Sequence, residues 1–281
     1  MKKNLLNIFI LLIMISCNSQ KELDLSVMTY NVRYGLADDG ENSWEYRKEF
    51  LASQLTFYNP NIFGTQEGLP FQVAYIDSQL PKHSFIGKSR DGGDKGEYSA
   101  IFYNHDKFEV IKQHTFWLSP TPNKVSKGWD AAYPRICTYG LFKDKETQNV
   151  FWIINTHLDH IGVNARKQSV HLILNKIKEI NIKNYPLILM GDLNAEPNSK
   201  PITLLKSELN DSKEVSIQKP FGTDGTFNAF QFSNPVTKRI DYIFISKNNT
   251  IKVNKYAVLS DSKDLKYPSD HLPVYVELQL N

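Results

Sequence analysis

Apolar and polar positions alternate along this chain with two different periods. Residues 25–32 alternate with a period of two, which predicts a strand, and the apolar positions that follow are spaced as in a helix until Asn59-Pro60 ends it. The same patterns predict further helices at 71–80, 166–180 and 202–209, and strands at 61–65, 84–87, 98–103, 108–118, 135–142, 150–156, 187–190, 240–245, 251–259 and 272–278.

The order of these elements favours an α/β fold. Strands and helices alternate in the first part of the chain, whereas strands dominate the last part. This order predicts a mixed sheet, or paired sheets, covered by helices. No internal repeat, low-complexity tract or linker interrupts the pattern, so one large domain is the simplest arrangement for 281 residues.

The N-terminal residues are expected to lie outside this domain. Lys2 and Lys3 precede an apolar run at 5–15, which is shorter than the roughly 20 residues needed to span a bilayer. Such a run is typical of a secretory signal peptide, although a short buried helix is an alternative. Its ending, Met14-Ile15-Ser16-Cys17, resembles a bacterial lipobox and implies cleavage before Cys17 and diacylation of its thiol.

The domain plan follows from this interpretation. We expect a lipoprotein signal peptide at 1–17, a polar tether at 18–24 and a single domain at 25–281. The protein would then be exported and anchored to a bacterial membrane, on the periplasmic or cell-surface face. A plain signal peptide that happens to contain a cysteine is the alternative.

Charge and cysteine content narrow the function classes. The chain carries 33 basic and 30 acidic residues, a net charge of +3, and removal of Lys2 and Lys3 with the signal peptide leaves +1. A general nucleic-acid binder usually has a clear basic excess, so nucleic acid is expected at most as a substrate. The remaining cysteine, Cys137, lies in a predicted strand and is expected to be a small buried hydrophobe.

One segment stands out for its chemistry. An apolar run stops at Gly191, and Asp192 and Asn194 follow before Pro197. Residues i and i+2 of an extended chain point to the same side, so a carboxylate and a carboxamide would face one cleft. Oxygen ligands at a strand end suit a hard metal ion and an attacking water, but an ordinary polar turn is the alternative.

Polar residues recur at the ends or beginnings of other predicted strands. In an antiparallel arrangement one strand's end neighbours the next strand's beginning, so these residues can gather on one edge. Singly, each has an ordinary explanation, such as a strand terminator, a helix cap or a core histidine. The six signals are Asn31, Gln66-Glu67, Asn155-Thr156-His157, Asp192-Leu193-Asn194, Arg239-Ile240-Asp241-Tyr242 and Ser269-Asp270-His271.

In this order, the six motifs resemble the endonuclease/exonuclease/phosphatase superfamily, whose fold is that of pancreatic deoxyribonuclease. The resemblance runs from about Leu25 to the C-terminus. It implies a four-layer α/β sandwich, in which two mixed, mostly antiparallel sheets pack face to face with helices outside. It also implies Mg²⁺- or Mn²⁺-dependent cleavage of phosphoester bonds.

The resemblance also implies roles for individual residues. Glu67 would be the main metal carboxylate, with Asn31 and Asp270 as direct or water-mediated ligands. Asp192 would orient or deprotonate the attacking water, and Asn194 would hold a phosphate oxygen. His271, paired with Asp241, would be a charged donor to the phosphoryl group. His157 would be a second donor near the leaving oxygen, and Glu97 would support His157.

The rest of the substrate would be held by Arg33, Arg135, His160 and Arg166, all close in sequence to site motifs. Arg135 and Arg166 could instead pair with surface acids. Three functions remain open: a monomeric, membrane-tethered phosphodiesterase or phosphatase for a small or lipid-linked phosphoester, an extracellular nuclease with the same site, and a catalytically silent binding module. The near-neutral charge favours the first.

Overall fold

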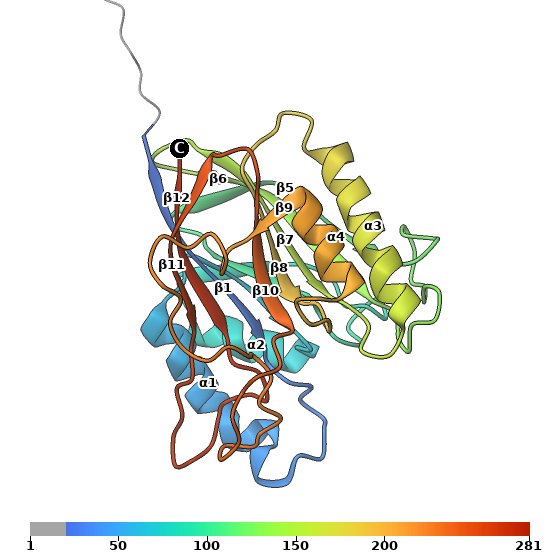
Figure 1. Ribbon diagram of the computed structural model, residues 1–281. Coiled ribbons are helices and arrows are strands. Elements are labelled where there is room, and N and C mark those ends of the chain that lie inside the picture. Colours follow the sequence, from blue (N-terminus) through green and yellow to red (C-terminus); the bar gives the residue numbers. More distant parts are fainter. Residues whose placement is uncertain (1–20) are drawn as a thin grey trace, which may run out of the picture.

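The structure is a computed structural model that describes residues 21–281, and the signal peptide expected at 1–17 lies outside the described residues. It contains two six-stranded sheets (Figure 1). The first has the order β11-β12-β1-β2-β4-β3, with β1 (Leu23–Asn31), β2 (Ile62–Gln66), β3 (His83–Ile86), β4 (Ile101–Asn104), β11 (Ile251–Val258) and β12 (Val274–Leu280).

The second sheet has the order β5-β6-β7-β8-β10-β9. The pairs β1–β2 and β7–β8 are parallel and the other neighbours antiparallel, so both sheets are mixed, as the resemblance implied. The strands of the second sheet are β5 (Phe108–Trp117), β6 (Ile136–Asp144), β7 (Val150–His157), β8 (Leu187–Asp192), β9 (Leu209–Asp211) and β10 (Asp241–Ser246).

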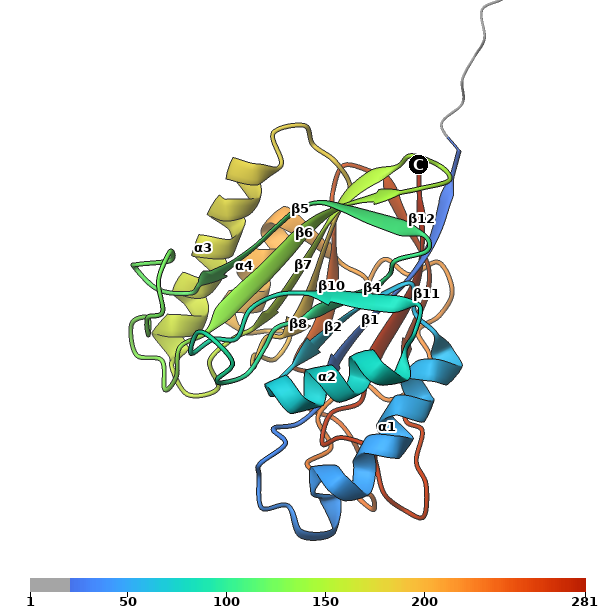
Figure 2. The ribbon, with the colours of Figure 1, turned by 180° about the vertical axis from the view of Figure 1, so that it is seen from behind.

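Helices cover the outer face of each sheet. Figure 2 shows α1 (Trp44–Tyr58) and α2 (Pro70–Gln79) against the first sheet, and α3 (Val163–Ile180) and α4 (Lys200–Glu208) against the second. A 3-10 turn, Gly40–Asn42, precedes α1. The four-layer sandwich expected from the sequence is therefore confirmed.

The period of two in the strands builds these layers. In β8, Ile188 and Met190 belong to the apolar core between the sheets. Leu187 and Leu189, one position out of phase, pack with the residues of α3 and α4. Every second side chain thus faces the partner sheet and the others face a helix, which makes a strand buried on both faces.

Some boundaries differ from the expectation. β1 begins at Leu23, so it takes in the last two residues of the expected tether. β4 begins only at Ile101, because Tyr98 forms isolated bridges with Gly68 and Ser89 instead. The three-residue strand β9 was not predicted, since so short a segment shows no period. Cys137 is fully buried, as predicted.

Within residues 21–281, no helix is long and apolar enough to cross a membrane. The lipid anchor expected at Cys17 remains a prediction from the sequence.

Candidate active site

The polar strand ends meet at one edge of the sandwich. β7 runs parallel to β8 and pairs His157 with Asp192, while antiparallel β10 pairs Asp241 with the same Asp192. A cavity of about 640 Å³ opens there. Most of the predicted site residues line it, namely Arg33, Glu67, Glu97, Arg135, His157, His160, Asp192, Asn194, Asp270 and His271.

Gly191 allows the close approach that aims Asp192 into this cavity. Its φ is +148°, and a Cβ at this position would lie 2.0 Å from the main-chain oxygen of Thr156 on β7. A side chain would therefore push β8 away from β7. The glycine that ends the apolar run in the sequence is required by this contact.

Asp192 is the centre of the site. It is 1% exposed, and its Oδ1 accepts the main-chain N–H of Asn194 at 2.9 Å. Its Oδ2 accepts the Asn31 amide at 3.0 Å and lies 3.5 Å from Nε2 of His157 and 3.8 Å from Nε2 of His271. Burial, and next the charge of Asp241, raise the pKa of Asp192 to about 7. A carboxylate with this pKa can accept a proton near neutral pH.

His271 is held as a cation. Burial lowers its pKa, but Asp241, whose Oδ2 lies 2.9 Å from Nδ1 of His271, and Asp192 outweigh burial and raise the pKa to about 10. The Thr226 hydroxyl donates to the same oxygen of Asp241 at 2.6 Å. Asp241 does not line the cavity itself and acts through the histidine, as predicted for this pair. The arrangement leaves Nε2 of His271 as a charged donor beside Asp192.

Glu67 is linked to Asp192 through the side chain of Asn31. Its Oε1 accepts the Asn31 amide at 2.9 Å and its Oε2 accepts the main-chain N–H of Tyr34 at 2.7 Å. The Oδ1 of Asn31 accepts the main-chain N–H of Arg33 at 3.0 Å, so the amino group of Asn31, and not its oxygen, bridges the two carboxylates. Asp270 lies nearby, with its Oδ2 3.5 Å from the Arg33 guanidinium.

These carboxylates fit a divalent cation. Glu67, His157 and Asp192 each offer a ligand atom, and the three atoms lie within 4.8 Å of one another. Burial, and to a lesser extent the charge of Glu67, raise the pKa of Asp270 against the opposing charge of His271. One or two carboxylates with neighbouring oxygens suit Mg²⁺. The geometry groups Glu67 with Asp192 and His157, whereas the resemblance grouped it with Asp270.

His157 is neutral in this arrangement. Burial and then Arg135 lower its pKa well below the usual value. The Asn194 amide donates to Nε2 of His157 at 3.1 Å and to the Leu158 carbonyl at 3.0 Å, so Nε2 is an acceptor. The ring proton is then on Nδ1, which lies 3.8 Å from Glu97. Asn194 thus orients the histidine, and the predicted role of His157 as a donor from Nε2 would need a rearrangement.

The predicted substrate-binding residues divide into two groups. Arg33, Arg135 and His160 line the cavity. Arg166, on α3, is not among the lining residues and donates to the carbonyl of Asp159 at 2.7 Å, which is a structural contact. Arg135 also pairs with the buried Asp159, at 3.2 Å, so it has a structural partner, and its contact with the substrate stays a prediction.

Seven lining residues were not among the site residues predicted from the sequence: Tyr34, Ala37, Arg90, Tyr133, Phe227, Lys238 and Ile240. Arg90 follows β3 and Tyr133 precedes β6, outside the motifs from which the site residues were predicted. Among the aromatic residues near these segments, Trp117 is packed, with 9% exposure, whereas Tyr133 is 51% exposed and lines the cavity.

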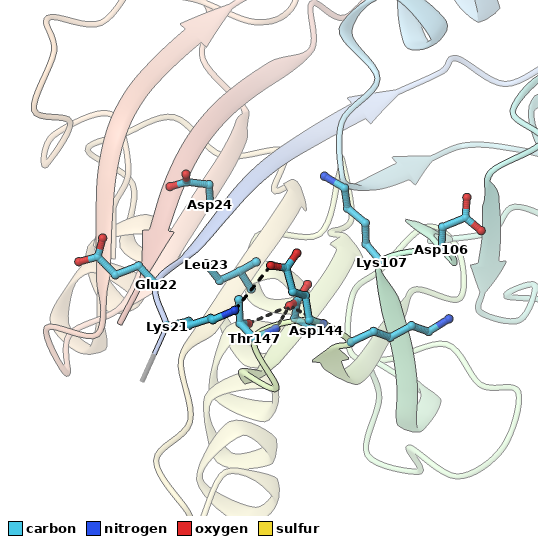
Figure 3. Close-up of a pocket in the computed structure, with 10 residues that line it drawn as sticks. Lys21, Glu22, Leu23, Asp24, Asp106, Lys107, Asp144 and Thr147 are labelled. Atoms are coloured by element: carbon cyan, nitrogen blue, oxygen red, sulfur yellow. Dashed lines mark hydrogen bonds and ion pairs between the residues drawn. The ribbon is translucent and has the colours of Figure 1, made fainter. Parts of the chain in front are cut away.

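A second hollow, of about 740 Å³, lies at the beginning of β1, whereas the candidate site lies at the end of that strand (Figure 3). The lining of this hollow is mostly charged. Asp144 accepts the main-chain N–H groups of Glu146 and Thr147 at 3.1 and 2.6 Å, so its carboxylate closes the turn between β6 and β7. Asp144 therefore has a structural role in this hollow.

Comparison with known proteins agrees with this geometry. The family model described as "Endonuclease/Exonuclease/phosphatase family" matches residues 28–271. A Bacteroides thetaiotaomicron protein described with the same family name is 39% identical, with a TM-score of 0.89 over 94% of this chain and 97% of that one. A second protein from that organism, described as a mannosyl-6-phosphatase, is 40% identical, with a TM-score of 0.86 over 90% of this chain and 99% of that one.

The similarity to curated proteins is weaker. The 3'-5'-exoribonuclease subunit Ccr4 of the Kluyveromyces lactis CCR4-Not complex is 21% identical over 85% of this chain. This chain spans only 38% of the length of that relative.

Proposed function

Because the chain belongs to the endonuclease/exonuclease/phosphatase family, a family of phosphoester hydrolases, we propose that it is a Mg²⁺- or Mn²⁺-dependent phosphatase or phosphodiesterase for a small or lipid-linked phosphoester. The observation that carries this proposal is that Asp192 lies beside a cationic histidine, His271, and is linked through the Asn31 amide to the carboxylate of Glu67 in one cavity. A proton acceptor, a charged donor and a cation-binding group are what phosphoester hydrolysis needs.

The residues divide the chemistry between them. Asp192 orients a water in line with the P–O bond that breaks and takes its proton as the water oxygen bonds to phosphorus. His271 donates a charged hydrogen bond to a phosphoryl oxygen, where negative charge accumulates. The leaving oxygen departs with the bonding electron pair and takes up a proton from solvent. A divalent cation held by Glu67 and Asp270 would neutralise charge on the phosphoryl oxygens, with the Asn31 amide positioning the carboxylate of Glu67.

A sugar phosphate is the substrate class that we favour. The similar Bacteroides thetaiotaomicron protein is described as a mannosyl-6-phosphatase and shares 40% of its residues with this chain. The cavity of about 640 Å³ is also in the range of small-molecule sites. Since substrate choice can differ between proteins of one fold, the assignment requires a direct assay.

An extracellular nuclease is the second candidate. It is supported by the relative described as an exoribonuclease, at 21% identity, and by the exposed Lys238 at the rim of the cavity. The near-neutral charge of the chain argues against it. For either activity we propose a monomer that the diacylated Cys17 tethers to a bacterial membrane on its periplasmic or cell-surface face.

A panel of substrates tests the proposal. The purified domain would be assayed with Mg²⁺ or Mn²⁺, and with EDTA as control, on hexose 6-phosphates, a bis-aryl phosphodiester, phospholipids, an RNA oligonucleotide and plasmid DNA. We expect EDTA-sensitive hydrolysis of the small phosphoesters. Faster cleavage of RNA or DNA would favour the nuclease, and no metal-dependent hydrolysis at all would favour a silent binding module.

Two variants connect the activity with the geometry. Asp192→Asn removes the proton acceptor and His271→Ala removes the charged donor, and each is expected to lower kcat by about 100- to 1000-fold or more. Circular dichroism and urea unfolding would show whether the fold is intact. Activity like that of the wild type in either folded variant would contradict the mechanism.

A further inference from the structure

Two aromatic rings form one wall of the cavity without any part in the chemistry described above. Tyr133 and His160 stack with their centroids 6.0 Å apart and their planes 16° apart. They come from two segments that the sheet brings together, since Tyr133 precedes β6 and His160 follows the neighbouring strand β7. Both line the cavity, and Tyr133 is 51% exposed.

Two arginines, Arg90 and Arg135, contact these rings and hold them in place. The Arg135 guanidinium donates to Nδ1 of His160 at 3.0 Å. The guanidinium carbon of Arg90 lies 4.9 Å from the centroid of the Tyr133 ring, and Arg90 itself is fixed by Glu97 at 2.7 Å. An exposed aromatic surface that is already held costs little entropy when a ligand packs on it. Ordinary surface tyrosines lack this support.

The polar groups of this wall specify what it can bind. Because Nδ1 of His160 accepts a hydrogen bond from a guanidinium, its ring proton is on Nε2, and the ring is a neutral donor at the edge of the stack. The two arginines are paired with acids, Arg90 with Glu97 and Arg135 with Asp159. Each pair lowers the net charge of the wall, and the N–H groups that have no hydrogen-bond partner among residues 21–281, Nε of Arg90 and one Nη of Arg135, are buried. The exposed part of the wall is therefore mainly aromatic, which suits a neutral ring better than a second phosphate.

We propose that Tyr133 and His160, supported by Arg90, form the subsite for the leaving group and select a pyranose ring. The apolar C–H face of the sugar packs on the aromatic pair, and hydroxyl oxygens at its edge accept hydrogen bonds from Nε2 of His160. This inference rests on the proposed phosphatase function and adds to it the residues that determine specificity.

The test compares a substrate with a ring and one without. Wild type, Tyr133→Ala, His160→Ala and Tyr133→Phe would be assayed on mannose 6-phosphate and on glycerol 3-phosphate. We expect Tyr133→Ala to lower kcat/KM for the sugar phosphate by about 10- to 50-fold, mainly through KM, and for glycerol phosphate by less than about 3-fold. His160→Ala should also lower the ratio of kcat/KM for the sugar phosphate to kcat/KM for glycerol phosphate. Tyr133→Phe keeps the ring and should retain the preference.

Each other outcome is informative. Tyr46→Ala is the matched control, because it removes a tyrosine that is 77% exposed on α1 and does not line this cavity. It should leave kcat/KM unchanged for both substrates. Equal losses on both substrates in Tyr133→Ala, or faster wild-type turnover of a nucleoside 5′-monophosphate than of the sugar phosphate, would overturn the pyranose subsite alone. No hydrolysis of any phosphoester would overturn the proposed function and the subsite with it.

Discussion

Arg47 joins α1 to the loop after Asn31 and to the loop before Asp270, two of the candidate metal-binding residues. Its guanidinium donates to four main-chain carbonyls, those of Val32 at 2.6 Å, Arg33 and Asn42 at 3.0 Å, and Pro268 at 3.1 Å. The residue is 4% exposed, and burial lowers its pKa to about 10, so the side chain remains cationic at neutral pH. Asn31 and Asp270 lie within two residues of these carbonyls.

Arg47→Met preserves much of the side chain's volume but removes every donor. The bonds to Val32 and Pro268 are buried, and an unpaired buried carbonyl costs about 1 to 3 kcal/mol. Two such groups make the expected loss about 3 kcal/mol, after allowing for the burial cost that the charge no longer imposes. Because both loops are released, we also expect a higher Mg²⁺ concentration at half-maximal activity and about a tenfold lower kcat/KM.

Urea unfolding and a Mg²⁺ titration of activity would measure these two effects. Lys48→Met is the matched control, because it removes the neighbouring cation of α1, whose ion pair is with Glu45 at the surface. An exposed pair of this kind contributes about 0.5 kcal/mol or less. If Arg47→Met costs less than about 1 kcal/mol, or leaves the Mg²⁺ dependence unchanged, the proposed role of Arg47 is refuted.

Three further predictions concern other segments. Gly191→Ala should lower the free energy of unfolding in urea by more than about 2 kcal/mol and reduce activity, since its Cβ would lie 2.0 Å from the Thr156 oxygen. The control Gly93→Ala, with no atom within 4 Å of the new Cβ, should cost only about 1 kcal/mol. Equal costs for the two variants would contradict the argument that the close approach requires Gly191. Asp130→Ala should cost about 1 kcal/mol, because its carboxylate accepts two main-chain N–H groups in the first turn of α3 at 2.6 and 3.2 Å; an unchanged unfolding midpoint would exclude this cap. Cys17→Ser should abolish fatty-acid labelling and detergent-phase partitioning in a bacterial host, and a labelled variant would exclude lipidation at this cysteine.

Residue type and period predicted a mixed sheet, or paired sheets, covered by helices, and the resemblance to a known family specified the four layers and the roles of the site residues. β8 illustrates the first part, because its apolar run with alternating faces is buried between a second sheet and a helix layer. Polar residues at the ends of such strands can gather at one edge, and Glu67, Asp192 and His271 do so here. The lipid anchor at Cys17 also follows from the sequence only and stays a prediction.

Tertiary structure decided what each side chain contacts. Asn31 and Asp192 are 161 residues apart, and their 3.0 Å hydrogen bond exists only because β1 packs against β8. No local pattern encodes such a distance, which explains why Arg166 was expected to bind the substrate although it is not among the residues that line the cavity, and why Tyr133 was not among the predicted site residues. Local periods reflect the alternation of faces along one element, whereas the wall formed by Tyr133 and His160 depends on which strands become neighbours and how closely the layers pack.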